Sequence, residues 1–253
     1  MDFKYRNNGH YKNHINSNIN DTKNISKSNN HLFSGKKVWL FDFDGVLVPA
    51  PNEEDCKKFI SNAITLISDL KGISRESSAK MYTDTVKKNN VNLHEFFINN
   101  FPELDGKIMM SKVFGEYNKK YQSLESDPNI IKIIKKLSRD GIRMGVFTNN
   151  TTDTVSSTMK RLGYLKHFEQ VIAYEQSYPF IKPEESSYKI ASEHFEVLNK
   201  DILFIDDSEE NVRVSKKLGI VSIRVSETKH EPEVADITVK NSEALLKLIR
   251  ENK

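Results

Sequence analysis

Short apolar runs that alternate with amphipathic helical segments constrain the fold of this 253-residue chain more than any other feature. The run 38–41, Val-Trp-Leu-Phe, is continuous and short, as in a strand that is covered on both faces. Similar runs occupy 142–147, 170–173, 201–205 and 220–225, and helical patterns occupy 130–139, 152–162, 184–195, 209–218 and 242–250. Such a succession predicts a parallel sheet with right-handed crossovers, in a doubly wound α/β domain.

One long segment interrupts the alternation. Residues 51–125 contain no strand-like run and have helical patterns throughout, for example 53–70, whose apolar residues are spaced to share one face. Because this segment follows the first strand directly, we expect an all-helical cap domain over the edge of the sheet. The α/β core would then comprise residues 34–50 and 126–253.

The amino-terminal residues differ in composition from the rest of the chain. Residues 1–33 are dominated by Asn, Ser, Lys and His, which cannot bury enough apolar surface to offset the entropy of ordering, so we expect a disordered extension. Residues 1–37 hold seven Lys or Arg and two Asp, a charge of +5, and the overall charge is only +3. The basic character therefore belongs to the tail, which lacks the Arg clusters and aromatics of a nucleic-acid site.

Cysteine content and hydropathy indicate the compartment. The single cysteine, Cys56, has no partner for an intramolecular disulfide, so we expect a reducing environment and a cytoplasmic protein. No stretch approaches the roughly 18 apolar residues that cross a bilayer. The sequence therefore predicts a soluble protein with no membrane association.

Polar residues follow the first strand at the point where ligands bind in open α/β sheets. Asp42 comes directly after the run 38–41, and Asp44, two residues later, points the same way in an extended segment. One carboxylate could act as a nucleophile while the other moves a proton, and Gly45 would let the chain turn away. By itself, Asp-x-Asp-Gly is equally typical of a turn.

Two further polar patches are candidates for binding a phosphate group. Thr148 and Asn149 end the run 142–147, ahead of a helix start, where a hydroxyl and backbone N–H groups could hold a phosphate, although helix capping explains them too. Lys182 precedes Pro183 and another helix start. There it could neutralise a phosphate and a neighbouring carboxylate, although a lysine is usually a solvated surface charge.

Asp206 and Asp207 end the run 201–205. Two adjacent acids at a buried strand end are costly without a cation, and oxygen ligands point to Mg²⁺. A helix N-cap explains one of these acids better than both.

The four patches, in this order, resemble the haloacid dehalogenase superfamily, specifically its phosphatase branch with a Rossmann-like core and a helical cap. The resemblance covers residues 38–225 and implies that Asp42 is a nucleophile that forms an aspartyl-phosphate, with Asp44 as general acid and base. It also implies that Thr148, Asn149 and Lys182 hold the phosphoryl group.

The same resemblance implies a metal site. Asp207 would bind Mg²⁺ together with the Asp42 carboxylate and the Asp44 carbonyl, and Asp206 would support the metal shell. Many members carry a further Asp four residues after the motif's own, and this chain has Asn211 there, so the role of Asn211 stays open.

The resemblance leaves several functions open. Residues 147–149 and 204–208 look most like pyrimidine 5′-nucleotidase-like members, whereas residues 44–46 look more like phosphoglycolate phosphatase and β-phosphoglucomutase relatives. An acid at Asp44 favours phosphoryl transfer over carbon–halogen cleavage, which needs no proton donor. The leading hypothesis is a Mg²⁺-dependent phosphatase for a small phosphorylated metabolite, with a nucleoside 5′-monophosphate as first candidate and phosphoglycolate or a sugar phosphate as alternatives. A β-phosphoglucomutase-like phosphomutase would use the same residues, and a regulatory protein that only binds phosphate or metal is a third hypothesis. Substrate choice would fall to the cap, where no residue receives a role.

Overall fold

A computed structural model describes residues 30–87 and 93–252. Most of the predicted disordered extension, residues 1–33, therefore lies outside the described residues. Its last four residues form a short helix, α1 (Asn30–Phe33), and the Phe33 ring lies 5.6 Å from that of Trp39 in the first strand. The described chain thus begins with a short helix whose apolar side chains pack on the core.

The core is one six-stranded sheet in the order β3-β2-β1-β4-β5-β6, with every pair parallel, which confirms the predicted fold class. The strands are β1 (Val38–Phe41), β2 (Arg143–Phe147), β3 (Gln170–Ile172), β4 (Ile202–Asp206), β5 (Val221–Val225) and β6 (Ile237–Val239). We did not predict β6 from the sequence, because Thr238 separates its two apolar residues and no continuous apolar run is left. The chain goes outward from β1 to β3 and then crosses back to β4, so the order reverses between β1 and β4.

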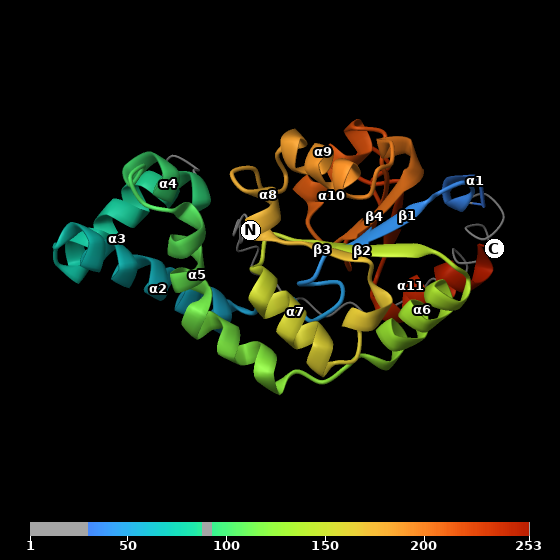
Figure 1. The fold of residues 1–253 in the computed structure, drawn as a ribbon, viewed down its shortest axis with the longest axis horizontal. Coiled ribbons are helices and arrows are strands. Elements are labelled where there is room, and N and C mark those ends of the chain that lie inside the picture. The colour runs from blue at the N-terminus through green and yellow to red at the C-terminus, as the bar shows by residue number, and fades with distance from the viewer. Residues whose placement is uncertain (1–29, 88–92, 253) are drawn as a thin grey trace.

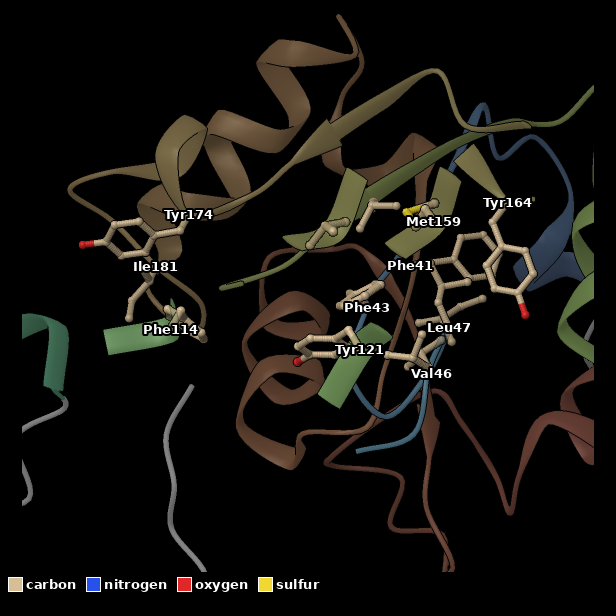
Figure 2. Packing of buried hydrophobic residues seen from close by; sticks show 14 of the residues in the cluster. Phe41, Phe43, Val46, Leu47, Phe114, Tyr121, Met159, Tyr164, Tyr174 and Ile181 are labelled. Carbon is tan, nitrogen blue, oxygen red and sulfur yellow. The ribbon is translucent and has the colours of Figure 1, made fainter. Parts of the chain in front are cut away.

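Helices cover both faces of the sheet (Figure 1). One face carries α6 (Pro128–Arg139), α7 (Thr152–Arg161) and α11 (Ser242–Glu251), and the other carries α9 (Glu185–His194) and α10 (Glu209–Lys217). Alternate β1 residues enter two separate apolar clusters: Trp39 and Phe41 join one, and Val38 and Leu40 join the other. Figure 2 shows Phe41 in the first cluster, beside Tyr164 and Leu47. The continuous apolar run of β1 is therefore explained by burial on both faces.

Residues 51–125, which we call the helical insertion, form a lobe beside the sheet (Figure 1). Its elements are α2 (Glu53–Lys71), α3 (Arg75–Tyr82), the π-helical turn η2 (Thr83–Lys87), α4 (Leu93–Asn100), α5 (Gly106–Tyr117) and the 3₁₀ helix η3 (Asn118–Ser123). Asn52 and Asp55 form a capping box that starts α2, and Phe59 of α2 packs on Phe114 of α5 with ring centroids 5.1 Å apart. α5 is followed directly by η3.

None of the described helices is both long and apolar enough to cross a bilayer. Cys56 is buried within the helical insertion.

Candidate active site

The carboxyl ends of β2, β1 and β4 lie side by side, and the predicted polar patches meet there. Asp42 follows β1 and donates its backbone N–H to Ile205 of β4 at 2.8 Å. Asp206 is the last residue of β4, and Thr148 follows β2. The position is the switch point of the sheet, where open α/β folds bind their ligands.

Lys182 lies buried between two of the predicted carboxylates. Its Nζ is 3.0 Å from Asp42 Oδ1 and 2.6 Å from Asp206 Oδ2, and the side chain is 1% exposed. Burial alone would lower the pKa of Lys182, but the charges of Asp206 and Asp42 outweigh it and raise the pKa above the usual value. Lys182 is therefore a fixed cation beside Asp42, rather than the solvated surface charge that its residue type suggests.

Asn149 holds the backbone of Lys182. Its side-chain amide donates to the Lys182 carbonyl at 2.8 Å, and its Oδ1 accepts from the Lys182 N–H at 2.9 Å. Both polar atoms of the Asn149 side chain are thus used to place Lys182. A contribution of Asn149 to phosphate binding would have to come from its backbone N–H.

Three carboxylates meet in one cluster. Asp42, Asp206 and Asp207 each offer an oxygen within 4.8 Å of the others. Burial raises the pKa of Asp206 and of Asp207, and repulsion from the neighbouring carboxylates adds to both shifts. A divalent cation stabilises the ionised forms of carboxylates that lie too close together to ionise easily. A site whose donors are all oxygen atoms suits Mg²⁺. The residues present therefore fit the metal that the sequence predicts.

The two adjacent acids have different surroundings. Both oxygens of Asp206 accept hydrogen bonds from Asn211 Nδ2 at 3.0 Å, and Oδ1 also accepts from the Ser208 N–H at 2.8 Å. With Lys182, these donors saturate Asp206, whereas no residue of the described chain donates a hydrogen bond to the Asp207 carboxylate. Asp207 could therefore offer its carboxylate to a cation, while Asn211 and Lys182 orient Asp206.

Asp44 is buried and held by two residues that the sequence analysis did not single out. Tyr121 donates to Asp44 Oδ1 at 2.6 Å, and Asn150 Nδ2 donates to Asp44 Oδ2 at 2.9 Å. Burial raises the pKa of Asp44 to about 6, although Lys120, Tyr121 and Asn150 act in the opposite direction. A carboxyl with this pKa can both give and accept a proton near neutral pH.

The amino terminus of α7 is less open than the sequence suggests. The Thr148 hydroxyl accepts from the Asn150 N–H at 3.2 Å, and Glu175 Oε2 accepts from both the N–H and the hydroxyl of Thr152 at 2.8 and 2.6 Å. A carboxylate of this chain therefore occupies the helix terminus that could have bound an anion. The groups at this helix start that could still bind a phosphate are therefore limited to Thr148 and the backbone beside it.

The helical insertion reaches the core on the segment that carries Lys182. His94 of α4 is buried, its Nδ1 lies 2.6 Å from the Tyr174 hydroxyl, and its Nε2 lies 2.6 Å from the Pro179 carbonyl oxygen. Tyr174 belongs to the short helix α8 (Tyr174–Ser177). Burial lowers the pKa of His94, which favours the neutral ring. This contact joins two segments that are distant in the sequence.

Gly45 approaches the metal cluster closely. Its φ is +80°, and a Cβ built on it would lie 2.2 Å from Asp207 Oδ2. We therefore expect Gly45→Ala to displace the Asp207 carboxylate and weaken Mg²⁺ binding about 10-fold or more, as changes around metal ligands do. Isothermal titration calorimetry on chelator-treated protein would measure this affinity.

Gly141→Ala is the matched control for that variant. Gly141 has a φ of +73°, and its Cβ would meet nothing within 4 Å. Both variants should lose about 1–2 kcal/mol of stability from the left-handed backbone. Only Gly45→Ala should bind Mg²⁺ more weakly, and equal affinities in both variants would contradict the placement of Asp207.

A family model described as haloacid dehalogenase-like hydrolase matches residues 39–225. A glyceraldehyde 3-phosphate phosphatase of Methanocaldococcus jannaschii is 23% identical over 151 residues, which cover 58% of this chain and 66%, or slightly under two thirds, of that protein. One of the same name from Methanopyrus kandleri is 21% identical over 230 residues, 85% of this chain and 97% of its own length.

A solved structure has a similar fold. The crystal structure of a phosphatase of the same superfamily from Thermococcus onnurineus superposes with a TM-score of 0.58, at 22% identity, over 84% of this chain and 97% of that one. At this level of identity the likeness concerns the fold.

Proposed function

This chain belongs to the haloacid dehalogenase-like hydrolase family, and on that premise we propose that it is a metal-dependent phosphatase that cleaves phosphate monoesters of small metabolites. The observation that carries the proposal is Asp44, a buried carboxyl with its pKa raised to about 6, two residues after Asp42. A leaving alkoxide needs a proton from such a group, whereas a leaving halide does not. The site therefore favours phosphoryl transfer.

In the first step Asp42 acts as the nucleophile. Its Oδ1 accepts from the Phe43 N–H at 2.7 Å and lies 3.0 Å from Lys182 Nζ, so we assign the attack on phosphorus to Oδ2. A bond forms between Oδ2 and phosphorus as the bond from phosphorus to the leaving oxygen breaks. Asp44 gives its proton to that oxygen, and the products are an alcohol and an aspartyl-phosphate.

In the second step Asp44, now a carboxylate, takes a proton from water. The water oxygen attacks phosphorus, the bond to Asp42 Oδ2 breaks, and inorganic phosphate leaves. Asp44 ends the cycle protonated and Asp42 ionised, so both groups return to their starting states.

Charge on the transferring group is balanced by Lys182 and by a divalent cation. Lys182 is fixed beside Asp42, and Thr148 lies at the same edge of the sheet. A cation bound by the Asp42 and Asp207 carboxylates and the Asp44 carbonyl, for which we propose Mg²⁺, would supply further positive charge. Asp206 would serve as support, because Lys182 and Asn211 already engage its oxygens.

We propose two candidate substrate classes. The curated relatives named above act, by their names, on glyceraldehyde 3-phosphate, which favours a short sugar phosphate. The runs around Thr148 and Asp206 favour a nucleoside 5′-monophosphate through their likeness to pyrimidine 5′-nucleotidase-like members. We propose the cytoplasm as its compartment, since a chain whose single cysteine is Cys56 cannot form an intramolecular disulfide.

A panel of phosphate esters tests this function. We expect Mg²⁺-dependent release of inorganic phosphate from the purified protein, with kcat/KM at least about 10-fold higher for one class of ester, because a pocket of matched contacts discriminates by that much. The panel should contain nucleoside monophosphates, phosphoglycolate, glyceraldehyde 3-phosphate and hexose phosphates. Equally slow turnover of all of them would count against a dedicated metabolite phosphatase, and chelation with EDTA should stop release.

The rival functions give different results in the same assay. A phosphomutase would convert one sugar phosphate isomer into another with little release of phosphate. A regulatory protein that only binds phosphate or metal would release none from any ester.

A further inference from the structure

Tyr121 lies at the centre of the contacts around Asp44, although it belongs to the helical insertion. Its hydroxyl donates to Asp44 Oδ1 at 2.6 Å and accepts from Asn150 Nδ2 at 2.9 Å. The same Asn150 amide nitrogen donates to Asp44 Oδ2 at 2.9 Å. Each oxygen of the Asp44 carboxyl group thus has its own donor, and the two donors are bonded to each other.

Contacts with residues of the α/β core also fix the position of Tyr121. Its ring lies 5.4 Å from the Phe43 ring, and Figure 2 shows the two rings next to each other with Val46 close by. Arg161 of α7 donates to the Tyr121 carbonyl oxygen at 2.6 Å and to the Leu124 carbonyl oxygen at 2.7 Å. The Tyr121 side chain is 2% exposed. The residue therefore has the fixed surroundings of a core residue.

The charged neighbours of Tyr121 tie it to the start of the insertion as well. Lys120 Nζ lies 4.7 Å from the centroid of the Tyr121 ring and 3.4 Å from Asp55 Oδ2 in the first turn of α2. These contacts join the last segment of the insertion, which also contacts Asp44, to α2 at its start.

We propose that Tyr121 is a positioning residue for Asp44, which it orients together with Asn150 so that the Asp44 proton is directed at the leaving oxygen. A carboxyl group rotates about its last bond, and proton transfer requires the donor oxygen to face the acceptor. Donors on both oxygens fix that rotation. The inference rests on the proposed function, because it assigns Tyr121 to the residue that serves there as general acid and base.

The test compares two esters that differ in their need for a proton. An alkyl phosphate has a poor leaving group that must be protonated, whereas p-nitrophenyl phosphate has a good one that leaves as an anion. For Tyr121→Phe, which loses only the hydroxyl, we expect kcat/KM to fall at least about 10-fold with the alkyl ester and less than about threefold with the aryl ester. We compare kcat/KM because it reports the first step alone, in which only the alkyl leaving group needs the Asp44 proton, whereas the second step is the same for both esters.

Two further variants make the result specific. Asn150→Ala removes the other donor and should give the same preference for the aryl ester. For Asp44→Asn we expect a larger preference for the aryl ester. Adding Tyr121→Phe to Asp44→Asn should cause no further loss of activity, because the two residues act as one unit.

Tyr164→Phe is the matched control. Tyr164 is a buried tyrosine after the end of α7, and its hydroxyl accepts from the Asp127 N–H at 3.0 Å. Removing that hydroxyl should change kcat/KM equally little for both esters. Thermal unfolding of all variants would verify that they are folded.

The outcomes separate this inference from the proposed function. Suppose that the wild type is active and that Asp44→Asn shows its selective effect on the alkyl ester. The positioning role is then overturned if Tyr121→Phe and Asn150→Ala lose equal activity on both esters, or lose none on either. A wild-type protein that hydrolyses neither ester, or an Asp44→Asn variant with unchanged activity, overturns the proposed function and the inference with it.

Discussion

The Asp42→Asn variant is expected to lose at least about 10⁴-fold in kcat, since loss of a catalytic nucleophile has effects of that order or larger. The amide has the size of the carboxylate but neither attacks phosphorus nor carries the negative charge that pairs with Lys182 at 3.0 Å. The effect should be the same for every ester, because the nucleophile takes part in both steps whatever the leaving group.

A chemical readout strengthens this test. Wild-type protein quenched in acid during turnover should retain phosphate on Asp42, detectable by mass spectrometry of the peptide, and Asp42→Asn should retain none. Asp153→Asn, an exposed acid in the first turn of α7, is the control and should remain active. Full activity of Asp42→Asn would remove the basis for covalent catalysis at this site.

Lys182→Met is the prediction with the next largest effect, and it acts on stability as well as on activity. Methionine fills a similar volume without the ammonium, so Asp42 and Asp206 are left buried beside each other without their cation. Removing one partner from a buried ion pair costs about 3–5 kcal/mol, and we expect this loss in the metal-free protein at pH 7. Activity should fall to near background, because the remaining charge on the phosphoryl group is uncompensated.

The pH dependence of this contribution follows from the pKa shift. The pKa of Lys182 is raised in the folded protein, so its contribution is complete below the ordinary lysine value and is lost only as the pH rises through the folded-state pKa. Urea unfolding at pH 7 in the presence of chelator therefore measures the whole effect. Destabilisation of less than about 1 kcal/mol would contradict the buried ion pair.

Lys136→Met is the matched control for Lys182→Met. Lys136 pairs with Asp140 at 2.9 Å on α6, and both side chains are partly exposed. This pair should contribute at most about 1 kcal/mol, as surface pairs do. Adding Asp206→Asn to Lys182→Met should restore part of the lost stability, because it removes one of the unpaired charges.

The main features of the core were predictable because they are local in the sequence. The run 38–41 and the acids after it appear within seven consecutive residues, and the end of a parallel strand has a fixed place in the fold. Asp42, Lys182 and Asp206 accordingly lie together, as their positions at the sheet edge suggested. Strand β6 was not predicted because Thr238 interrupts its apolar residues, so it has no continuous apolar run.

Contacts between the helical insertion and the core were beyond the reach of such patterns. Tyr121 is 77 residues from Asp44, and His94 is 80 residues from Tyr174. Nothing in the helical period of the insertion distinguishes a residue that packs inside it from one that reaches the core. A contact within the core was equally hard to foresee, because Glu175 of α8 accepts a hydrogen bond from Thr152 at the start of α7, 23 residues away.

The contact between His94 and Pro179 has a consequence for how such a protein could acquire a new substrate. Pro179 lies three residues before Lys182, and Asn149 holds the backbone of Lys182 at the far end of that short segment. A substitution in α4 that moves His94 is therefore expected to shift the segment that carries Lys182. If the insertion selects the leaving group, selectivity and turnover would not be independent properties, and an evolutionary path toward a new metabolite should require compensating changes between residues 174 and 183.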